Sequence, residues 1–182
     1  MKHSLGMIEV VSIPAGMQAA DAMMKAAAVE LVYAQAVCAG KYIAVVSGEV
    51  AAVEAGVKAG SKSAGPKLID SVVIAGVHEQ VPQAISACSE IGQVQAVGAI
   101  ETFSLCAAVL VADAAVKAAD VDLIEIRLGR GLGGKSFITL TGDVAAVEAA
   151  VKAGTGEPQA RGLISGSVVI ASPHPGIVRT FI

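Results

Sequence analysis

The chain contains the same stretch of sequence twice. LGMIEVVSIPAGMQAADAMMKAAAVELV, which begins at Leu5, aligns without a gap with VGAIETFSLCAAVLVADAAVKAADVDLI, which begins at Val97. After two extra residues in the second copy, GKYIAVVSGEVAAVEAGVKAG from Gly40 matches GKSFITLTGDVAAVEAAVKAG from Gly134. Charged and glycine positions recur as well as alanines, so the repeat is a duplication and not an accident of composition. The fold must therefore be one that a segment of about 90 residues can adopt twice.

The duplication divides the 182 residues into two predicted domains. We assign residues 1–92 to the first domain, including a linker helix at about 78–90, and residues 93–182 to the second. The linker segment, 78–95, has no counterpart in the other copy. Units this small, whose apolar residues are mainly alanine and valine, have thin cores. We therefore expect another domain or subunit to cover part of each apolar surface.

Each copy shows the same order of predicted elements, which fixes the fold class. A strand and an Ala-rich helix come first, then two strands separated by a glycine-containing turn, then a short helix and a last strand. The predicted ranges are 6–12, 15–28, 30–37, 42–47, 48–60 and 68–75, and then 98–104, 107–119, 122–128, 136–141, 142–154 and 163–171. Gly60 and Gly154 mark the predicted ends of the short helices. The order β-α-β-β-α-β predicts an α/β (α+β) ferredoxin-like fold with helices on one face of each sheet.

Charge and hydropathy exclude two classes of partner. Thirteen basic and sixteen acidic residues give a net charge of -3, and the signs alternate without a basic block, which argues against nucleic acid as the main partner. The longest uncharged run, 162–178, contains Pro173 and Pro175. It is too broken for a membrane-spanning helix, which needs about 20 apolar residues. Glu9 interrupts the apolar start that an export signal needs, so a cytoplasmic location is predicted.

Three motifs resemble those of a known family. GMIEVVSIPAGMQAADAMMKAAAVEL, GEVAAVEAGVKAG and SVVIAGVH are similar to the first strand and helix, the second helix and the last strand of bacterial microcompartment shell domains, and the second copy carries the same signatures. The chain resembles the tandem-domain (BMC-T) shell proteins, most closely the PduT type of propanediol-utilisation microcompartments. The resemblance implies a homotrimer that forms a flat pseudohexagonal disc with a central pore. It also implies no enzymatic activity, and assembly with other shell proteins around encapsulated enzymes, redox enzymes among them.

The family's edge motifs are matched in part. Its D-x-x-x-K helix implies that Lys25 and Lys117 lie at the tile edge, and its final histidine is matched by His78 and His174. The family often has an arginine just before this histidine, and this chain has none there, so the edge contact is expected to rest more on the lysines. Spacing alone also explains each lysine as the partner of an aspartate four residues earlier, an ion pair worth about 0.2–0.5 kcal/mol to a helix.

One cysteine lies at the turn that the family places at the pore. Cys38 is followed by the small residues Ala39 and Gly40, and a threefold axis would bring three copies of it together. The resemblance implies one 4Fe-4S cluster per trimer on the three thiolates, which relays electrons or clusters across the shell. The alternative is a passive tile whose pore conducts small metabolites past an unliganded Cys38. Cys88 and Cys106 form no CxxC pair and are predicted to be packing residues.

The turn of the second copy has a pattern that suggests a different function. The resemblance implies a pore lined by the turns of both copies, at Ala39, Gly40, Lys41, Arg130, Gly131, Leu132, Gly133 and Gly134. Residues 129–136 also satisfy the P-loop pattern G-x-x-x-x-G-K-[ST]. That pattern binds phosphate where a helix follows, whereas the alternating FITLTG predicts a strand. A ligand-sensing or NTP-binding domain is therefore a remote alternative, and Arg130 is either a pore charge that favours anions or an ordinary loop charge.

Overall fold

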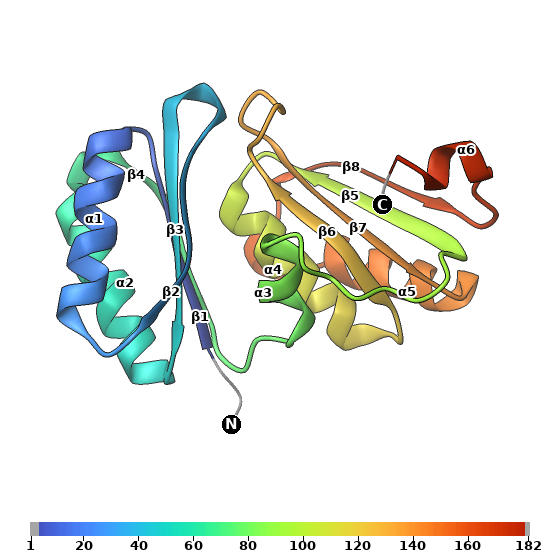
Figure 1. Ribbon diagram of the computed structural model, residues 1–182, viewed down its shortest axis with the longest axis horizontal. Coiled ribbons are helices and arrows are strands. Elements are labelled where there is room, and N and C mark those ends of the chain that lie inside the picture. Colours follow the sequence, from blue (N-terminus) through green and yellow to red (C-terminus); the bar gives the residue numbers. More distant parts are fainter. Residues whose placement is uncertain (1–3, 181–182) are drawn as a thin grey trace. The chain divides into compact units, whose positions relative to one another are not determined.

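The computed structural model describes residues 4–180, which form two compact units. Residues up to Val77 and the turn Gly129–Gly134 form the first unit, and His78–Leu128 with the chain from Lys135 onward form the second. Each unit is a four-stranded antiparallel sheet with two long helices packed on one of its faces (Figure 1). In the described part of the chain, no helix has the length and apolar character to cross a bilayer.

The first unit follows the predicted order of elements. It consists of β1 (Ser4–Val10), α1 (Ile13–Ala26), β2 (Glu30–Val37), the short 3-10 turn η1 (Cys38–Gly40), β3 (Lys41–Gly48), α2 (Val50–Ala64), η2 (Gly65–Lys67) and β4 (Leu68–Ile74). The strand order is β2-β3-β1-β4, with every neighbouring pair antiparallel. This order confirms the predicted ferredoxin-like fold.

The second unit repeats this plan. It consists of α3 (Gln80–Ile85), β5 (Ala96–Thr102), α4 (Leu105–Ala118), β6 (Asp122–Leu128), β7 (Ser136–Gly142), α5 (Val144–Thr155), η3 (Pro158–Ala160), β8 (Ile164–Ile170) and α6 (Pro175–Val178). Its strand order, β6-β7-β5-β8, is that of the first unit. The linker helix α3 is shorter than expected. The sequence assigned this helix to the first domain, whereas in the structure it belongs to the second unit, because it packs against β6.

The predicted end of the first short helix was wrong for a packing reason, whereas that of the second agrees with the structure to within one residue. α2 continues through Gly60 to Ala64, and α5 continues through Gly154 to Thr155. A Cβ atom at Gly60 would lie 2.5 Å from Met23 Cγ, and one at Gly154 would lie 3.0 Å from Ile100 Cδ1. These glycines let each helix approach its neighbours and do not cap it. In the first unit the helix ends instead at Gly65, whose φ of 55° lies in the left-handed region.

Candidate pore turn and assembly surfaces

The turn that carries Cys38 is a tight reversal between β2 and β3. Ala39 has φ 62° and ψ 27°, and Gly40 has φ 69°, so two successive residues adopt the left-handed conformation. This conformation costs an alanine about 1–2 kcal/mol, which the surrounding contacts must offset. The Cys38 side chain is half-buried, and no atom lies within 4 Å of the place that a Cβ atom of Gly40 would occupy.

The glycine turn Gly129–Gly134 lies against the Cys38 turn. Cys38 N donates to Gly129 O at 2.9 Å, and Gly131 N donates to Cys38 Sγ at 2.9 Å. The Arg130 guanidinium lies 5.9 Å from the centre of the Tyr33 ring. The structure therefore brings together Cys38, Arg130 and Gly131, three of the residues that the sequence assigns to the pore. Whether they line a pore stays a prediction.

Lys41, another of the predicted pore residues, is engaged by a buried carboxylate. Its ammonium lies 2.7 Å from Glu9 Oε1 and 3.5 Å from Gly134 O. The Glu9 side chain is 0% exposed and that of Lys41 is 17% exposed, so this ion pair is part of the interior. The sequence analysis missed the pair, although the recurrence of Glu9 and Lys41 in the second copy was a signal that could have revealed it.

The second copy repeats this ion pair near the surface. Lys135 Nζ lies 2.9 Å from Glu101 Oε2, and the two side chains are 38% and 41% exposed. Lys135 Nζ also lies 3.1 Å from Ser165 Oγ and 5.3 Å from the centre of the Phe103 ring. The lysine of the P-loop pattern is therefore bound to protein groups. The sequence predicted a strand after this pattern, and strand β7 follows it. The turn therefore lacks the helix N-terminus that a phosphate site needs.

The Lys135–Glu101 pair gives a pH-dependent contribution to stability. Hydrogen bonds from Lys135 and Ser165 lower the pKa of Glu101 from its ordinary value of 4.5. A carboxyl whose pKa is lower in the folded state contributes stability above its unfolded pKa, and this stability is lost as the pH falls through the folded pKa. As the pH falls from 5 to about 3, we expect the unfolding free energy of Glu101→Gln to decrease less than that of the parent chain. Urea titrations of both chains at each pH measure this difference. Parallel pH profiles for the two chains would contradict this.

The tile-edge residues of the second unit meet around one aspartate. Lys117 Nζ lies 2.5 Å from Asp113 Oδ2, and His78 N donates to Asp113 Oδ1 at 2.8 Å. The Asp113 side chain is only 9% exposed. The corresponding pair in α1, Lys25 and Asp21, is 2.6 Å apart but is 75% and 58% exposed. The ion pair predicted from spacing is thus present in both copies, and the edge role of these residues and of His174 stays a prediction.

The two other cysteines differ from each other. Cys106 is fully buried in α4, which confirms the predicted packing role. Cys88 was expected in the linker helix as a packing residue, and this was wrong, because α3 ends at Ile85 and Cys88 is exposed. Within residues 4–180, no three His, Cys, Asp or Glu side chains of one chain are grouped so that they could hold a metal ion.

The outer surface of α1 has apolar residues that are exposed, whereas the equivalent apolar residues of α4 are buried. Ile13, Met17 and Met24 are 38%, 57% and 38% exposed. Their equivalents in α4 are Leu105, Val109 and Val116, which are 0%, 0% and 6% exposed. The duplicated helix thus has one copy whose outer side is covered and one whose outer side is open to solvent. A stripe of three large apolar side chains on one helix is typical of an interaction surface.

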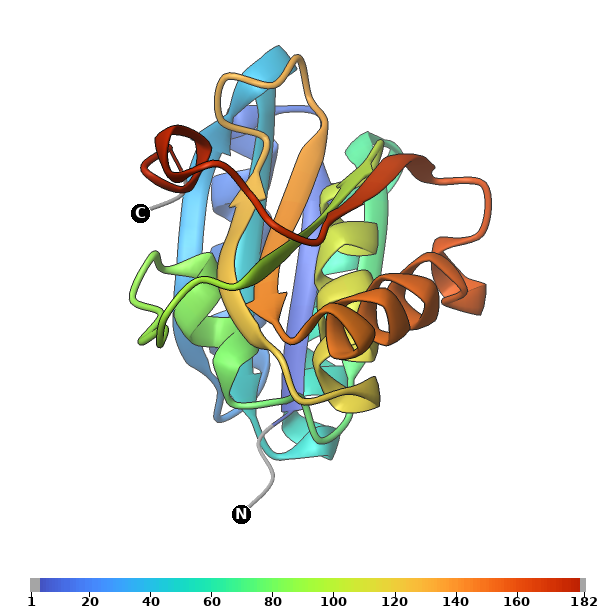
Figure 2. The ribbon, with the colours of Figure 1, turned by 90° about the vertical axis from the view of Figure 1, so that its right-hand side faces the viewer.

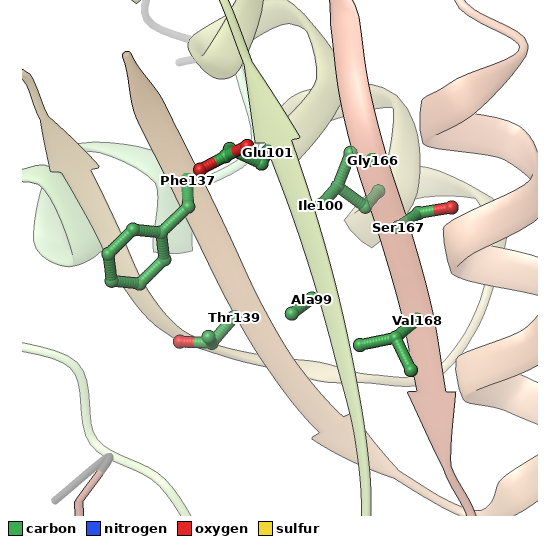
Figure 3. Close-up of a pocket in the computed structure, with 8 residues that line it drawn as sticks. All are labelled: Ala99, Ile100, Glu101, Phe137, Thr139, Gly166, Ser167 and Val168. Atoms are coloured by element: carbon green, nitrogen blue, oxygen red, sulfur yellow. The ribbon is translucent and has the colours of Figure 1, made fainter. Parts of the chain in front are cut away.

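The second sheet also has an open apolar face, on the side away from α4 and α5. A shallow pocket there is lined by Ala99, Glu101, Phe137, Thr139 and Val168, from the neighbouring strands β7, β5 and β8 (Figure 3). Val168 is 50% exposed. The equivalent residues of the first sheet, Met7, Ile43, Val45 and Val72, are all buried. Thr139 Oγ1 is buried without a hydrogen-bond partner among the described residues.

The comparisons with known proteins agree with this geometry. The model of the BMC domain matches residues 4–77 and 96–173. The whole chain is 37% identical to the bacterial microcompartment shell protein PduT of Citrobacter freundii, of which it covers 99%. A stretch of 85 residues, 44% of the chain, is 40% identical to the carboxysome shell protein CcmK2 of Synechococcus elongatus, of which it covers 83%.

Solved structures give the same result. A microcompartment protein from Desulfitobacterium hafniense has a TM-score of 0.92 at 49% identity, over 98% of this chain and 99% of that one. The fused permuted hexameric shell protein MSM0275 from the RMM microcompartment has a TM-score of 0.61 at 22% identity, over 84% of this chain and 79% of that one. This second likeness shows the fold alone. The chain belongs to the bacterial microcompartment shell proteins, and it carries two BMC domains in tandem.

Proposed function

We propose that three copies of this shell protein form a closed disc whose central pore holds a 4Fe-4S cluster on Cys38. The disc is a structural, non-enzymatic tile that assembles with other shell proteins in the wall of a microcompartment. The proposal has two parts, the trimer and the cluster, and different observations support them.

Two unpaired apolar surfaces support the trimer. The outer side of α1 and the open face of the second sheet are exposed, while the equivalent helix and the equivalent sheet face are buried. Because the two surfaces belong to different copies of the repeat, a contact between them joins chains head to tail. Head-to-tail contacts close into a ring when the rotation between subunits allows it. A ring with pseudo-sixfold symmetry, such as the resemblance implies, needs three chains of two domains each.

The Cys38 turn supports the cluster. The observation that carries it is a half-buried sulfur that accepts a hydrogen bond from Gly131 N. In the same turn, Gly40 adds no side chain, and the space that its Cβ atom would occupy is open. One chain offers one thiol, so the site is complete only in the trimer. The donor set fits, because Fe–S clusters are held by thiolates and their potentials respond to hydrogen bonds to sulfur. Three symmetric thiolates leave the fourth iron to a ligand from outside the protein.

The chain's own residues would hold and tune this site. When bound, such a cluster supplies one-electron transfer. The Gly131 amide holds the Cys38 sulfur in place. Lys41 Nζ, which pairs with Glu9 of β1, also contacts Gly134 O of the glycine turn. A cluster at the pore could be reached from there. This location suits both electron relay across the shell and delivery of clusters to encapsulated redox enzymes.

The test is iron and sulfide analysis together with native mass on protein purified without oxygen. We expect one 4Fe-4S cluster per three chains, with the broad visible absorbance of such clusters. Cys38→Ser is expected to lose the iron while it stays trimeric, and Cys88→Ser, which alters another exposed thiol, is the matched control that keeps it. Colourless trimers without iron would favour the passive tile whose pore conducts small metabolites, and a monomer at every concentration would contradict the trimer itself.

A further inference from the structure

The chain ends in a segment that repeats a docking element of the second unit but lies exposed. We propose that this segment, residues 171–178, here called the C-terminal arm, docks on β2 and α1 of a second copy of the chain. This inference rests on the proposed trimer and names contacts that hold it together. The arm contains α6, the short turn beyond the end of β8 (Figures 1 and 2).

The arm and the segment after β4 have the same local structure. In each, three residues separate the end of the strand from a histidine, and a short helix, α3 or α6, follows. His78 O accepts from Val81 N at 3.0 Å, as His174 O accepts from Ile177 N at 2.8 Å. His78 Nδ1 lies 3.4 Å from Gln80 N, and His174 Nδ1 lies 3.1 Å from Gly176 N. The two segments thus share the local hydrogen bonds of their histidines, and Gly176 stands where the first segment has Gln80.

The segment after β4 is docked within the second unit. His78 N donates to Asp113 Oδ1 at 2.8 Å, and the Gln80 side chain accepts from Leu123 N of β6 at 2.8 Å. Val81, which follows in α3, is 0% exposed, and Leu123 is 1% exposed. The docking therefore combines a hydrogen bond to a buried carboxylate with the packing of α3, which carries the buried Val81, against the edge strand β6.

The equivalent groups of the arm and of the first unit are exposed. Ile177, the counterpart of Val81, is 47% exposed, and Leu31 of β2, the counterpart of Leu123, is 48% exposed. Asp21, the counterpart of Asp113, has a side chain that is 58% exposed. Among residues 4–180, the C-terminal arm thus has no acceptor surface within its own unit, and the surface of β2 and α1 has no docked segment. In the proposed contact, the arm of one chain docks on β2 and α1 of a second copy. His174 N then donates to Asp21 of the neighbouring chain, and Ile177 packs on its Leu31.

Two pairs of variants separate this docking from local effects. Asp21→Ala removes the proposed acceptor, whereas Lys25→Ala removes the same ion pair within α1 but keeps the carboxylate. His174→Pro removes the backbone donor at a residue whose φ of -63° a proline adopts, whereas His174→Ala keeps the donor and removes the imidazole. The three side chains that these variants change are exposed, so the fold of the chain should persist, as circular dichroism would verify.

The readout is the trimer dissociation constant, measured by sedimentation over a range of protein concentrations. Loss of a hydrogen bond to a charged acceptor weakens each contact by about tenfold or more. We expect Asp21→Ala and His174→Pro to dissociate at a correspondingly higher concentration, and Lys25→Ala and His174→Ala to match the parent chain. A parent trimer with all four variants unchanged would overturn the arm docking alone. A parent chain that is monomeric throughout would overturn the proposed trimer, and the docking with it.

Discussion

Replacement of Lys41 by methionine is expected to lower the free energy of unfolding by about 3–5 kcal/mol, the usual cost when one partner of a buried ion pair is removed. The reason is the Glu9 carboxylate, which is 0% exposed and lies 2.7 Å from the Lys41 ammonium. Methionine fills a similar volume but removes the ammonium group that pairs with this carboxylate. The measurement is urea unfolding of the parent and the variant in the same buffer.

The chain provides its own control for this prediction. Lys135→Met removes the equivalent cation in the second copy, where both side chains of the pair are more than a third exposed. Water screens such a pair, so the expected loss is about 1 kcal/mol or less. Equal losses for the two variants would show that burial does not decide the strength of these pairs, and would contradict the prediction.

The second large effect concerns the contact between α1 and β3. A Cβ atom at Gly16 would lie 2.6 Å from Tyr42 Cγ, closer than packed atoms come. Alanine is favoured over glycine in a helix by about 1 kcal/mol. The steric conflict outweighs this gain, since overpacking costs about 1–3 kcal/mol and more when the backbone must move. We therefore expect Gly16→Ala to lower the unfolding free energy of the chain.

The second copy shows how the conflict can be relieved. At the positions equivalent to Gly16 and Tyr42 it has Ala108 and Ser136, both fully buried or nearly so. Glycine thus pairs with the large side chain and alanine with the small one. The double variant Gly16→Ala with Tyr42→Ser should be less destabilised than the sum of the single variants, by about 1–3 kcal/mol of coupling. Simple additivity in the double-mutant cycle would contradict this account of the packing.

The repeat made it possible to predict the fold from the sequence alone. Two copies with the same order of strands and helices permit few topologies, and both sheets have the expected strand order. The end of α2 could not be predicted from the sequence, because Gly60 looks like a helix cap until the side chain that it faces is known. Sequence spacing records the local conformational preference of a glycine but not a close approach between distant segments.

The candidate site could be predicted from the sequence only in part. The resemblance led to Cys38 and to the glycine turn, and the pattern of FITLTG correctly predicted the strand that follows this turn. The hydrogen bond from Gly131 to Cys38 joins residues 93 positions apart, and the sequence of neither turn indicates that the two turns are in contact. The different burial of the two Glu–Lys pairs was also hidden, because identical residues in the two copies have different surroundings.

The unlike composition of the two turns has a consequence for oxidation chemistry. A ring of six identical domains with Cys38 in every turn would present six thiols, which could all be consumed as three disulfides. In the proposed trimer the second copy contributes Gly129–Gly134, which contains no cysteine, so the ring presents three thiols. Disulfide formation among the three thiols of one disc can therefore join only two of them, and the third stays reduced as long as no other oxidant or thiol reacts with it.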